Sequence, residues 1–175
     1  MVERTNIVTF QGNPLTLIGD EIKVGDKLPD CQLVGNDLSR VQLSSFKGKL
    51  CIISCVPSLD TPVCDLQTRR FNEEAGKFGE NVAVITVSMD LPFAQQRWCG
   101  NASAENIITL SDYMTAGLAK SLGVLIKELH LFARAVFVVD KQGVITYVQI
   151  VREVTNEPDY EEVLKALRNC YEKIG

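Results

Sequence analysis

Six cysteines, at positions 31, 51, 55, 64, 99 and 170, are the residues of this chain most able to do redox or metal chemistry. Cys64 has the most informative setting, because it follows two prolines in the stretch PSLDTPVCDLQTRRF, residues 57 to 71. Thr61 is a favoured N-cap residue, and Pro62 suits the first helical position, where its missing N–H costs nothing. Cys64 then stands at the third helical position, where free N–H groups and the helix dipole favour an anion. The pattern predicts a thiolate at a helix start.

A thiolate is the nucleophilic form of cysteine. Ionisation alone accelerates a thiol reaction only modestly, so a fast reaction also needs donors for the charge that develops in the transition state. The Thr61 hydroxyl and the first-turn N–H groups are local candidates. Asp65 opposes ionisation, and Arg69 or Arg70 can offset it. The alternative is that Thr61 only begins a helix and that Cys64 is a small, inert packing residue.

A second constellation is Cys51 and Cys55, four residues apart on one face of the predicted strand KLCIISC, residues 49 to 55. With His130, the chain's one histidine, they would supply three ligands for a soft metal ion. Ligand pairs usually lie on turns, however, and these two cysteines lie within an apolar strand. The metal site is therefore an alternative to the thiolate hypothesis.

The remaining cysteines differ in their expected freedom to move. Cys99 ends the predicted short helix PFAQQRWC, just before Gly100, and a thiol at a fraying helix end can change position. Packing at the helix end is the alternative for Cys99. Cys170 borders the apolar stripe of the last helix and Cys31 lies in the short apolar run CQLV, so core or boundary packing is expected for both.

The elements that must position these residues alternate between strands and helices. Apolar, β-branched runs predict strands: residues 31–34, 49–55, 82–88 and 106–110, with hairpins at 5–18 and 135–151. Helical periodicity, caps and glycines predict helices: residues 62–78, 92–99 and 112–123, with a last helix from Pro158. This order indicates an α/β fold with a mixed sheet flanked by helices.

The two longer helices carry apolar faces that should pack on the sheet. The expected buried residues of the first are Val63, Leu66, Phe71, Ala75 and Phe78, with Gly79 just past its end. Those of the last helix are Tyr160, Val163, Leu164, Leu167, Tyr171 and Ile174.

Composition narrows the class of protein further. A chain of 175 residues with 46% hydrophobic content fits one domain, 1–175, with a sizeable core. Its net charge of −4, with no basic tract, argues against nucleic acid as a partner. The longest apolar runs reach about a third of the length that a bilayer-spanning helix needs, so no membrane partner is expected. The first residues, MVERTNIVTFQG, lack a signal-peptide pattern, and we expect a cytoplasmic protein with reduced thiols.

Pro57-x-x-x-Thr61-x-x-Cys64 resembles the active-site signature of the peroxiredoxins, thioredoxin-fold enzymes that reduce hydroperoxides. Within that family the chain is similar to the bacterial thiol peroxidases, the atypical 2-Cys type. The supporting segments are VGDKLPD (24–30), VSMDLPFAQQRWC (87–99), ARAVFVVD (133–140) and TNEPDYEEVL (155–164). With the N-terminal hairpin, the resemblance covers almost the whole chain.

The resemblance implies a thioredoxin-dependent peroxidase with a central mixed sheet. Cys64 would be the peroxidatic cysteine, which becomes a sulfenic acid, and Cys99 the resolving cysteine, which converts it to an intramolecular disulfide. Thr61 would orient thiolate and peroxide, Pro57 would shield the site from water, and Arg134 would be the active-site arginine. The implied partners are a hydroperoxide, thioredoxin and a second copy of the chain in a homodimer, with no cofactor or metal.

Several alternatives stay open beside this hypothesis. Cys55, nine positions before Cys64, is a possible resolving partner, although a strand cysteine has less freedom to move. The chain could also be a thioredoxin-fold metal carrier that uses Cys51, Cys55 and His130, or a redox-sensing module. A disulfide needs Cα atoms within about 7 Å. Cys64 begins one predicted helix and Cys99 ends another, so intact helices are expected to hold the two cysteines too far apart. We therefore expect residues 61–67 and 93–100 to unwind locally when Cys64 and Cys99 join.

Overall fold

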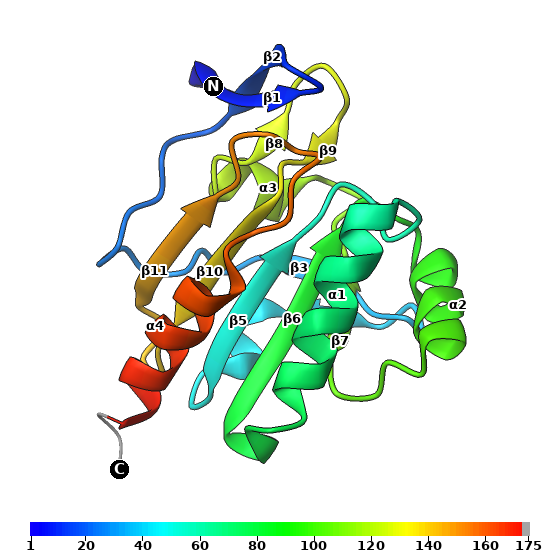
Figure 1. The fold of residues 1–175 in the computed structure, drawn as a ribbon, viewed down its shortest axis with the longest axis vertical. Helices are drawn as coiled ribbons and strands as arrows, with labels where there is room; N and C mark the ends of the chain where they lie inside the picture. Colours follow the sequence, from blue (N-terminus) through cyan, green and yellow to red (C-terminus); the bar gives the residue numbers. More distant parts are fainter. Residues whose placement is uncertain (173–175) are drawn as a thin grey trace.

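The computed structural model describes residues 1–172 and contains a larger and a smaller β-sheet (Figure 1). The larger sheet has the order β11-β10-β5-β6-β7-β3-β4. Its strands are β3 (Gln32–Val34), β4 (Arg40–Gln42), β5 (Leu50–Cys55), β6 (Val82–Ser88), β7 (Ile108–Ser111), β10 (Ala135–Val139) and β11 (Ile145–Ile150). Strands β5, β6 and β7 run parallel, whereas β10, β11, β3 and β4 pair antiparallel with their neighbours. The prediction of a mixed sheet is confirmed.

The smaller sheet is antiparallel, with the order β1-β2-β8-β9. Its strands are β1 (Glu3–Phe10), β2 (Asn13–Ile18), β8 (Leu125–Ile126) and β9 (Leu131–Phe132). Gln11 and Gly12 connect β1 to β2, and both have positive φ angles, 50° and 81°. A two-residue hairpin turn of type I′ requires positive φ at both positions. The N-terminal hairpin predicted around Gly12 is confirmed.

The helices cover both faces of the larger sheet. They are α1 (Pro62–Ala75), α2 (Pro92–Ala102), α3 (Gly117–Ser121) and α4 (Tyr160–Glu172), with 3-10 turns η1 (Leu43–Phe46) and η2 (Gly79–Asn81). Figure 1 shows α1 and α4 in front of the sheet, with α2 beyond α1 on the right of the view. Accordingly, α1 contacts β6, α4 contacts β5, β10 and β11, and α2 contacts β7. Among the described residues, no helix has the length and hydropathy needed to cross a membrane.

Strand alternation divides the core into two clusters. Leu50 and Ile52 of β5 point to the face covered by α1 and α4, into a cluster that also contains Cys64. Cys51 and Cys55 point to the opposite face, into a cluster shared with α3 and the smaller sheet. Successive residues of a strand face opposite sides, so the sheet itself separates these two groups.

Helix α1 is shorter than predicted, and its buried face coincides only in part with the predicted one. It ends at Ala75 with Gly76 as its C-cap, rather than near residue 78. The predicted core residue Leu66 is 52% exposed. The buried positions are Cys64, Gln67, Thr68, Phe71 and Ala75, which share one helical face. Phe71 and Ala75 are buried as predicted, whereas Val63 and Leu66 are not, because the polar residues Gln67 and Thr68 take buried positions beside Cys64.

The other helix boundaries also needed correction. Helix α2 continues through Gly100 to Ala102 and ends at Ser103, whose φ of 52° is left-handed. Helix α3 covers only five residues of the predicted 112–123, because Ala116, also left-handed, precedes it and the Asp112 carboxylate accepts the N–H of Ala119. Strand β7 begins two residues later than predicted.

In α4, Val163, Leu164 and Leu167 are buried as predicted, whereas Tyr171 is exposed. Ile174 lies outside the described residues.

Candidate active site

Cys64 lies in the first turn of α1, directly after the loop that leaves β5. Thr61 is the N-cap with extended backbone, Pro62 is the first helical residue, and the Asp65 N–H donates to the Thr61 carbonyl at 3.0 Å. Cys64 therefore occupies the third helical position, as predicted. Its side chain is 0% exposed. The sulfur is therefore closed to solvent in this conformation.

Arg134 is the charged group that meets the Cys64 sulfur. It precedes β10, is 2% exposed, and uses three nitrogens as donors. Nη2 donates to Cys64 Sγ at 3.4 Å, Nη1 to Gln67 Oε1 at 2.9 Å, and Nε to the Val154 carbonyl at 2.9 Å. A buried guanidinium needs hydrogen-bond acceptors of this kind, and its charge next to the sulfur stabilises a thiolate. The candidate residues Cys64 and Arg134, 70 positions apart, are thus brought together.

Gln67 connects this pair to the sheet, and sequence reasoning missed it. Its Oε1 accepts from Arg134, and its Nε2 donates to Ser54 Oγ on β5 at 2.8 Å. Gln67 stands three residues after Cys64, on the same helical face. That spacing is the available signal, because a polar residue on a buried helical face needs a buried partner.

The loop before α1 is fixed by Asp90, a second residue that was missed. Its carboxylate accepts from Ser58 Oγ at 2.7 Å and from the Leu59 N–H at 2.8 Å. Pro57, at the start of this loop, is buried. Thr61 makes no side-chain cap bond, and its hydroxyl donates to the Ser58 carbonyl at 3.0 Å. Thr61 therefore caps α1 through its backbone only.

Cys99 lies inside α2 rather than at its end, and it is half-buried. Its sulfur is 3.4 Å from Thr109 Oγ1 on β7. The Thr109 hydroxyl donates to Asn36 Oδ1 at 2.9 Å, so its oxygen is free to accept the Cys99 S–H. Cys99 packs against the core cluster that contains Cys64, and both are free thiols.

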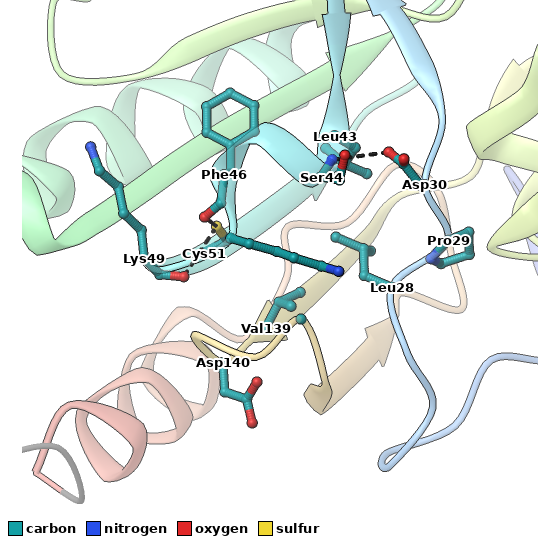
Figure 2. A pocket seen from close by; sticks show the side chains of 12 residues that line it. Leu28, Pro29, Asp30, Leu43, Ser44, Phe46, Lys49, Cys51, Val139 and Asp140 are labelled. Atoms are coloured by element: carbon teal, nitrogen blue, oxygen red, sulfur yellow. Dashed lines mark hydrogen bonds between the residues drawn. The ribbon is translucent and has the colours of Figure 1, made fainter.

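Cys51 and Cys55 lie outside this site, on the other face of the sheet from Cys64. Cys55 faces the opposite side of the sheet from Cys64, and full burial raises the pKa of its thiol. Cys51, near the start of β5, backs a separate pocket of about 90 Å³ (Figure 2). Figure 2 shows its sulfur directed to the carbonyls of Phe46 and Lys49. Burial raises the pKa of Cys51 to about 11, so it stays a neutral thiol near pH 7.

The proposed metal-ligand set does not assemble. Cys51 and Cys55 share one face of β5, as predicted, but they are core residues. His130 is exposed in the turn between β8 and β9 of the smaller sheet. Among residues 1–172, no group of three histidine, cysteine or acidic side chains is placed to hold a metal ion.

A buried cysteine in the first turn of a helix, bound by a buried arginine and accompanied by a second half-buried thiol, defines a thiol-dependent oxidoreductase. Comparisons with known proteins agree. Residues 23–164 match the family model described as Redoxin. A thiol peroxidase of Halalkalibacterium halodurans is 54% identical over 161 residues, which cover 92% of this chain and 96% of that protein. A thiol peroxidase of Bacillus subtilis is 51% identical over 161 residues, with the same coverage, 92% and 96%.

A solved structure, that of a peroxiredoxin-like protein from Aquifex aeolicus, superposes with a TM-score of 0.88 at 44% identity and covers 95% of this chain and 97% of that one. The chain therefore belongs to the Redoxin family. The predicted thioredoxin-like α/β fold is confirmed, and the protein is a thiol-based peroxidase.

Proposed function

We propose that Cys64 is the peroxidatic cysteine of this peroxidase and that it reduces hydrogen peroxide and organic hydroperoxides. The observation that carries the proposal is the 3.4 Å contact from Arg134 Nη2 to Cys64 Sγ, in the first turn of α1. The guanidinium stabilises the thiolate and then the negative charge that develops on the peroxide oxygens. The free N–H groups of the helix start act in the same direction.

In the first step the Cys64 thiolate attacks the terminal oxygen of the hydroperoxide. An S–O bond forms and the O–O bond breaks, so the sulfur is oxidised to a sulfenic acid and the alkoxide leaves, taking a proton from water. The Thr61 hydroxyl already donates to the Ser58 carbonyl, which leaves its oxygen to accept a hydrogen bond from the hydroperoxide. Pro57, buried beside this loop, keeps water from the sulfur.

In the second step Cys99 resolves the sulfenic acid. Its sulfur attacks Cys64, the S–S bond forms, the S–O bond breaks, and the hydroxyl leaves as water with the Cys99 proton. Cys55 is unsuited to this role, because it lies across the sheet and its raised pKa disfavours a thiolate. A thioredoxin dithiol then reduces the disulfide and is itself oxidised.

The other assignments rest on family membership. We propose that the chain forms one domain over residues 1–175, works in the cytoplasm as part of antioxidant defence, and forms a homodimer. Sedimentation of the reduced protein tests the dimer, since a monomer at micromolar concentration would contradict it.

A coupled assay tests the mechanism: NADPH oxidation with thioredoxin, its reductase and hydrogen peroxide. Cys64→Ser should lose activity by at least about 10³-fold, because the nucleophile is gone. Cys99→Ser should still consume one equivalent of peroxide but fail to turn over with thioredoxin. Cys170→Ser is the matched control, since this half-buried thiol contacts Thr146 at 3.2 Å, and its activity should equal wild type. Unchanged activity in Cys64→Ser would refute the assignment.

A further inference from the structure

Asp65 and Trp98 are the immediate sequence neighbours of the two cysteines, and they bind one another between α1 and α2. Trp98 Nε1 donates to Asp65 Oδ1 at 2.8 Å. The other carboxylate oxygen, Oδ2, accepts from Arg69 Nε, also at 2.8 Å. The Arg69 guanidinium lies over the Trp98 ring, 5.6 Å from its centroid. Both carboxylate oxygens of Asp65 thus accept a hydrogen bond. The Trp98 indole contacts Asp65 at its N–H edge and Arg69 at its face.

The indole end of this contact is shielded from water, whereas the side chains of Asp65 and Arg69 are 32% and 46% exposed. Trp98 is only 8% exposed and belongs to the same core cluster as Cys64. A charged acceptor strengthens a hydrogen bond from an indole that is largely shielded from water. By contrast, Asp60 and Arg97 form a second pair between the same segments, but both side chains are about two-thirds exposed and 3.9 Å apart. Such exposed pairs contribute little.

We propose that Asp65, Arg69 and Trp98 form a latch that couples the release of the two thiols. In the reduced protein the sulfurs have separate partners, Arg134 for Cys64 and Thr109 for Cys99. Both contacts must break before the sulfurs can bond. Unwinding the first turn of α1 carries Asp65 away together with Cys64, which frees Trp98 and with it the adjoining turn of α2.

The latch acts on the second chemical step and therefore rests on the proposed roles of the two cysteines. While it is closed, α2 stays docked, and the Cys64 sulfenic acid waits for Cys99. Asp65, Arg69 and Trp98 are positioning residues, since they act by holding helices that carry the reacting sulfurs. Weakening the latch should make disulfide formation faster and leave less sulfenic acid to be over-oxidised.

The test compares Asp65→Asn, Asp65→Ala and Trp98→Phe with wild type. Reduced protein receives one equivalent of hydrogen peroxide, free thiols are blocked at successive times, and mass spectrometry follows Cys64 sulfenic acid and the disulfide. Asp65→Ala, which loses both hydrogen bonds, should form the disulfide about 5- to 10-fold faster. Trp98→Phe keeps the ring and loses one bond, so it should gain about 2- to 3-fold. Asp65→Asn keeps an acceptor for the indole but loses the charge, so its disulfide rate should lie between those of wild type and Asp65→Ala.

Asp60→Ala is the matched control, because it removes a carboxylate from the same segment without touching the latch. Its disulfide rate should stay within about 2-fold of wild type. A latch variant with an unchanged or slower disulfide rate would overturn the proposal, and so would an equal acceleration in Asp60→Ala.

A second readout requires no peroxide. Amide exchange in the reduced protein should quicken at residues 65–68 and 95–100 together in Asp65→Ala, and at neither in Asp60→Ala. Trp98 is the chain's one tryptophan, so its emission reports the same opening. Exchange that quickens in only one helix refutes the coupling. Wild type that forms no disulfide refutes the proposed function instead, while this exchange result still decides whether the latch exists.

Discussion

At the residue scale, the site is organised by the three hydrogen-bond acceptors of one buried guanidinium. Arg134 donates to a sulfur, an amide oxygen and a backbone carbonyl. The amide oxygen of Gln67 and the Val154 carbonyl are neutral, so they hold the guanidinium without cancelling its charge. Cys64 is then the one partner of the three that can carry a full negative charge. This arrangement explains why a polar residue occupies a buried position of α1.

Removing the amide of Gln67 tests this arrangement. Gln67→Met keeps the approximate volume but leaves Arg134 Nη1 buried without an acceptor, and it also removes the bond to Ser54. We expect the second-order rate of peroxide reduction to fall about 10-fold and the free energy of unfolding to fall by about 1–3 kcal/mol. Stopped-flow kinetics and denaturant unfolding measure the two effects.

Thr68→Val is the matched control for Gln67→Met. The Thr68 hydroxyl is equally buried but donates only to the Cys64 carbonyl of its own helix, at 2.7 Å. Its loss should leave the peroxide rate within about 2-fold of wild type. Equal rate losses in both variants would mean that α1 is merely disturbed, and would contradict the role assigned to Gln67.

Burial also predicts which thiols are inert. Cys51, with its pKa raised to about 11, and Cys55, with its pKa raised by full burial, remain protonated as pH rises through the neutral range. Iodoacetamide reacts with thiolates, so both should stay unlabelled at pH 7.5 in the native protein and be labelled after unfolding. Peptide mass spectrometry measures this. Native labelling of Cys51 as fast as that of half-buried Cys170 would contradict the prediction.

The sequence located the sulfur but not its partners. Cap chemistry is local, so the position of Cys64 could be predicted from Thr61 and Pro62. The same reasoning failed for the Thr61 side chain, which makes no cap bond to the helix and donates its hydroxyl to the Ser58 carbonyl. Arg134 came only from the family resemblance, and Gln67 was missed, since contacts over 67 to 70 residues depend on the whole fold.

At the element scale, strands were predicted better than helix ends. Runs such as 82–88 are buried along their whole length, so composition alone marks their limits. Helix ends depend on single residues that adopt special conformations. Helix α2 passes through Gly100, where a helix stop was expected, and stops at Ser103 in a left-handed conformation. Cys99 therefore sits one turn inside a helix, and we expect that turn to open when Cys99 joins Cys64.

Gly100→Ala tests whether α2 must open. Gly100 is helical, and a Cβ there would meet no atom within 4 Å, so alanine should stabilise α2 by up to about 1 kcal/mol. We expect disulfide formation to slow by up to about 5-fold, with the peroxide step unchanged. The exposed neighbour Asn101→Ala should give a smaller change of the same sign. A melting temperature that rises with no change in disulfide rate would show that α2 does not unwind.

At the scale of the whole molecule, the smaller sheet is joined to the segment that orients Arg134 by backbone hydrogen bonds and by one carboxylate. The Thr9 N–H donates to the Arg152 carbonyl at 2.7 Å, and the Val154 N–H donates to the Thr9 carbonyl at 2.9 Å. Glu153 accepts from Thr9 Oγ1 at 2.9 Å and from the Gly12 N–H at 2.8 Å, both in the N-terminal hairpin. The next residue, Val154, gives its carbonyl to Arg134. The hairpin, far from Cys64 in sequence, thus supports the segment that orients the guanidinium. The hairpin could be predicted from the sequence, but its contact with the segment that orients Arg134 could not, because that contact depends on the whole fold.

Glu153 also predicts how this support depends on pH. Backbone N–H groups of Thr155 and Gly12 lower the pKa of Glu153 to about 2 from its ordinary value of 4.5. A lowered carboxyl pKa stabilises the folded state above about pH 4.5, and the contribution is lost as pH falls toward 2. Glu153→Gln should therefore lower the melting temperature by about 2–4 °C at pH 7. The difference in melting temperature between Glu153→Gln and wild type should shrink steadily below pH 4.5. At pH 7 the amides of β1 and β2 should exchange faster in Glu153→Gln than in wild type. Exposed Glu105→Gln is the control and should show neither effect. A difference in melting temperature that stays constant from pH 7 to pH 2.5 would mean that the ionised carboxylate does not hold the hairpin.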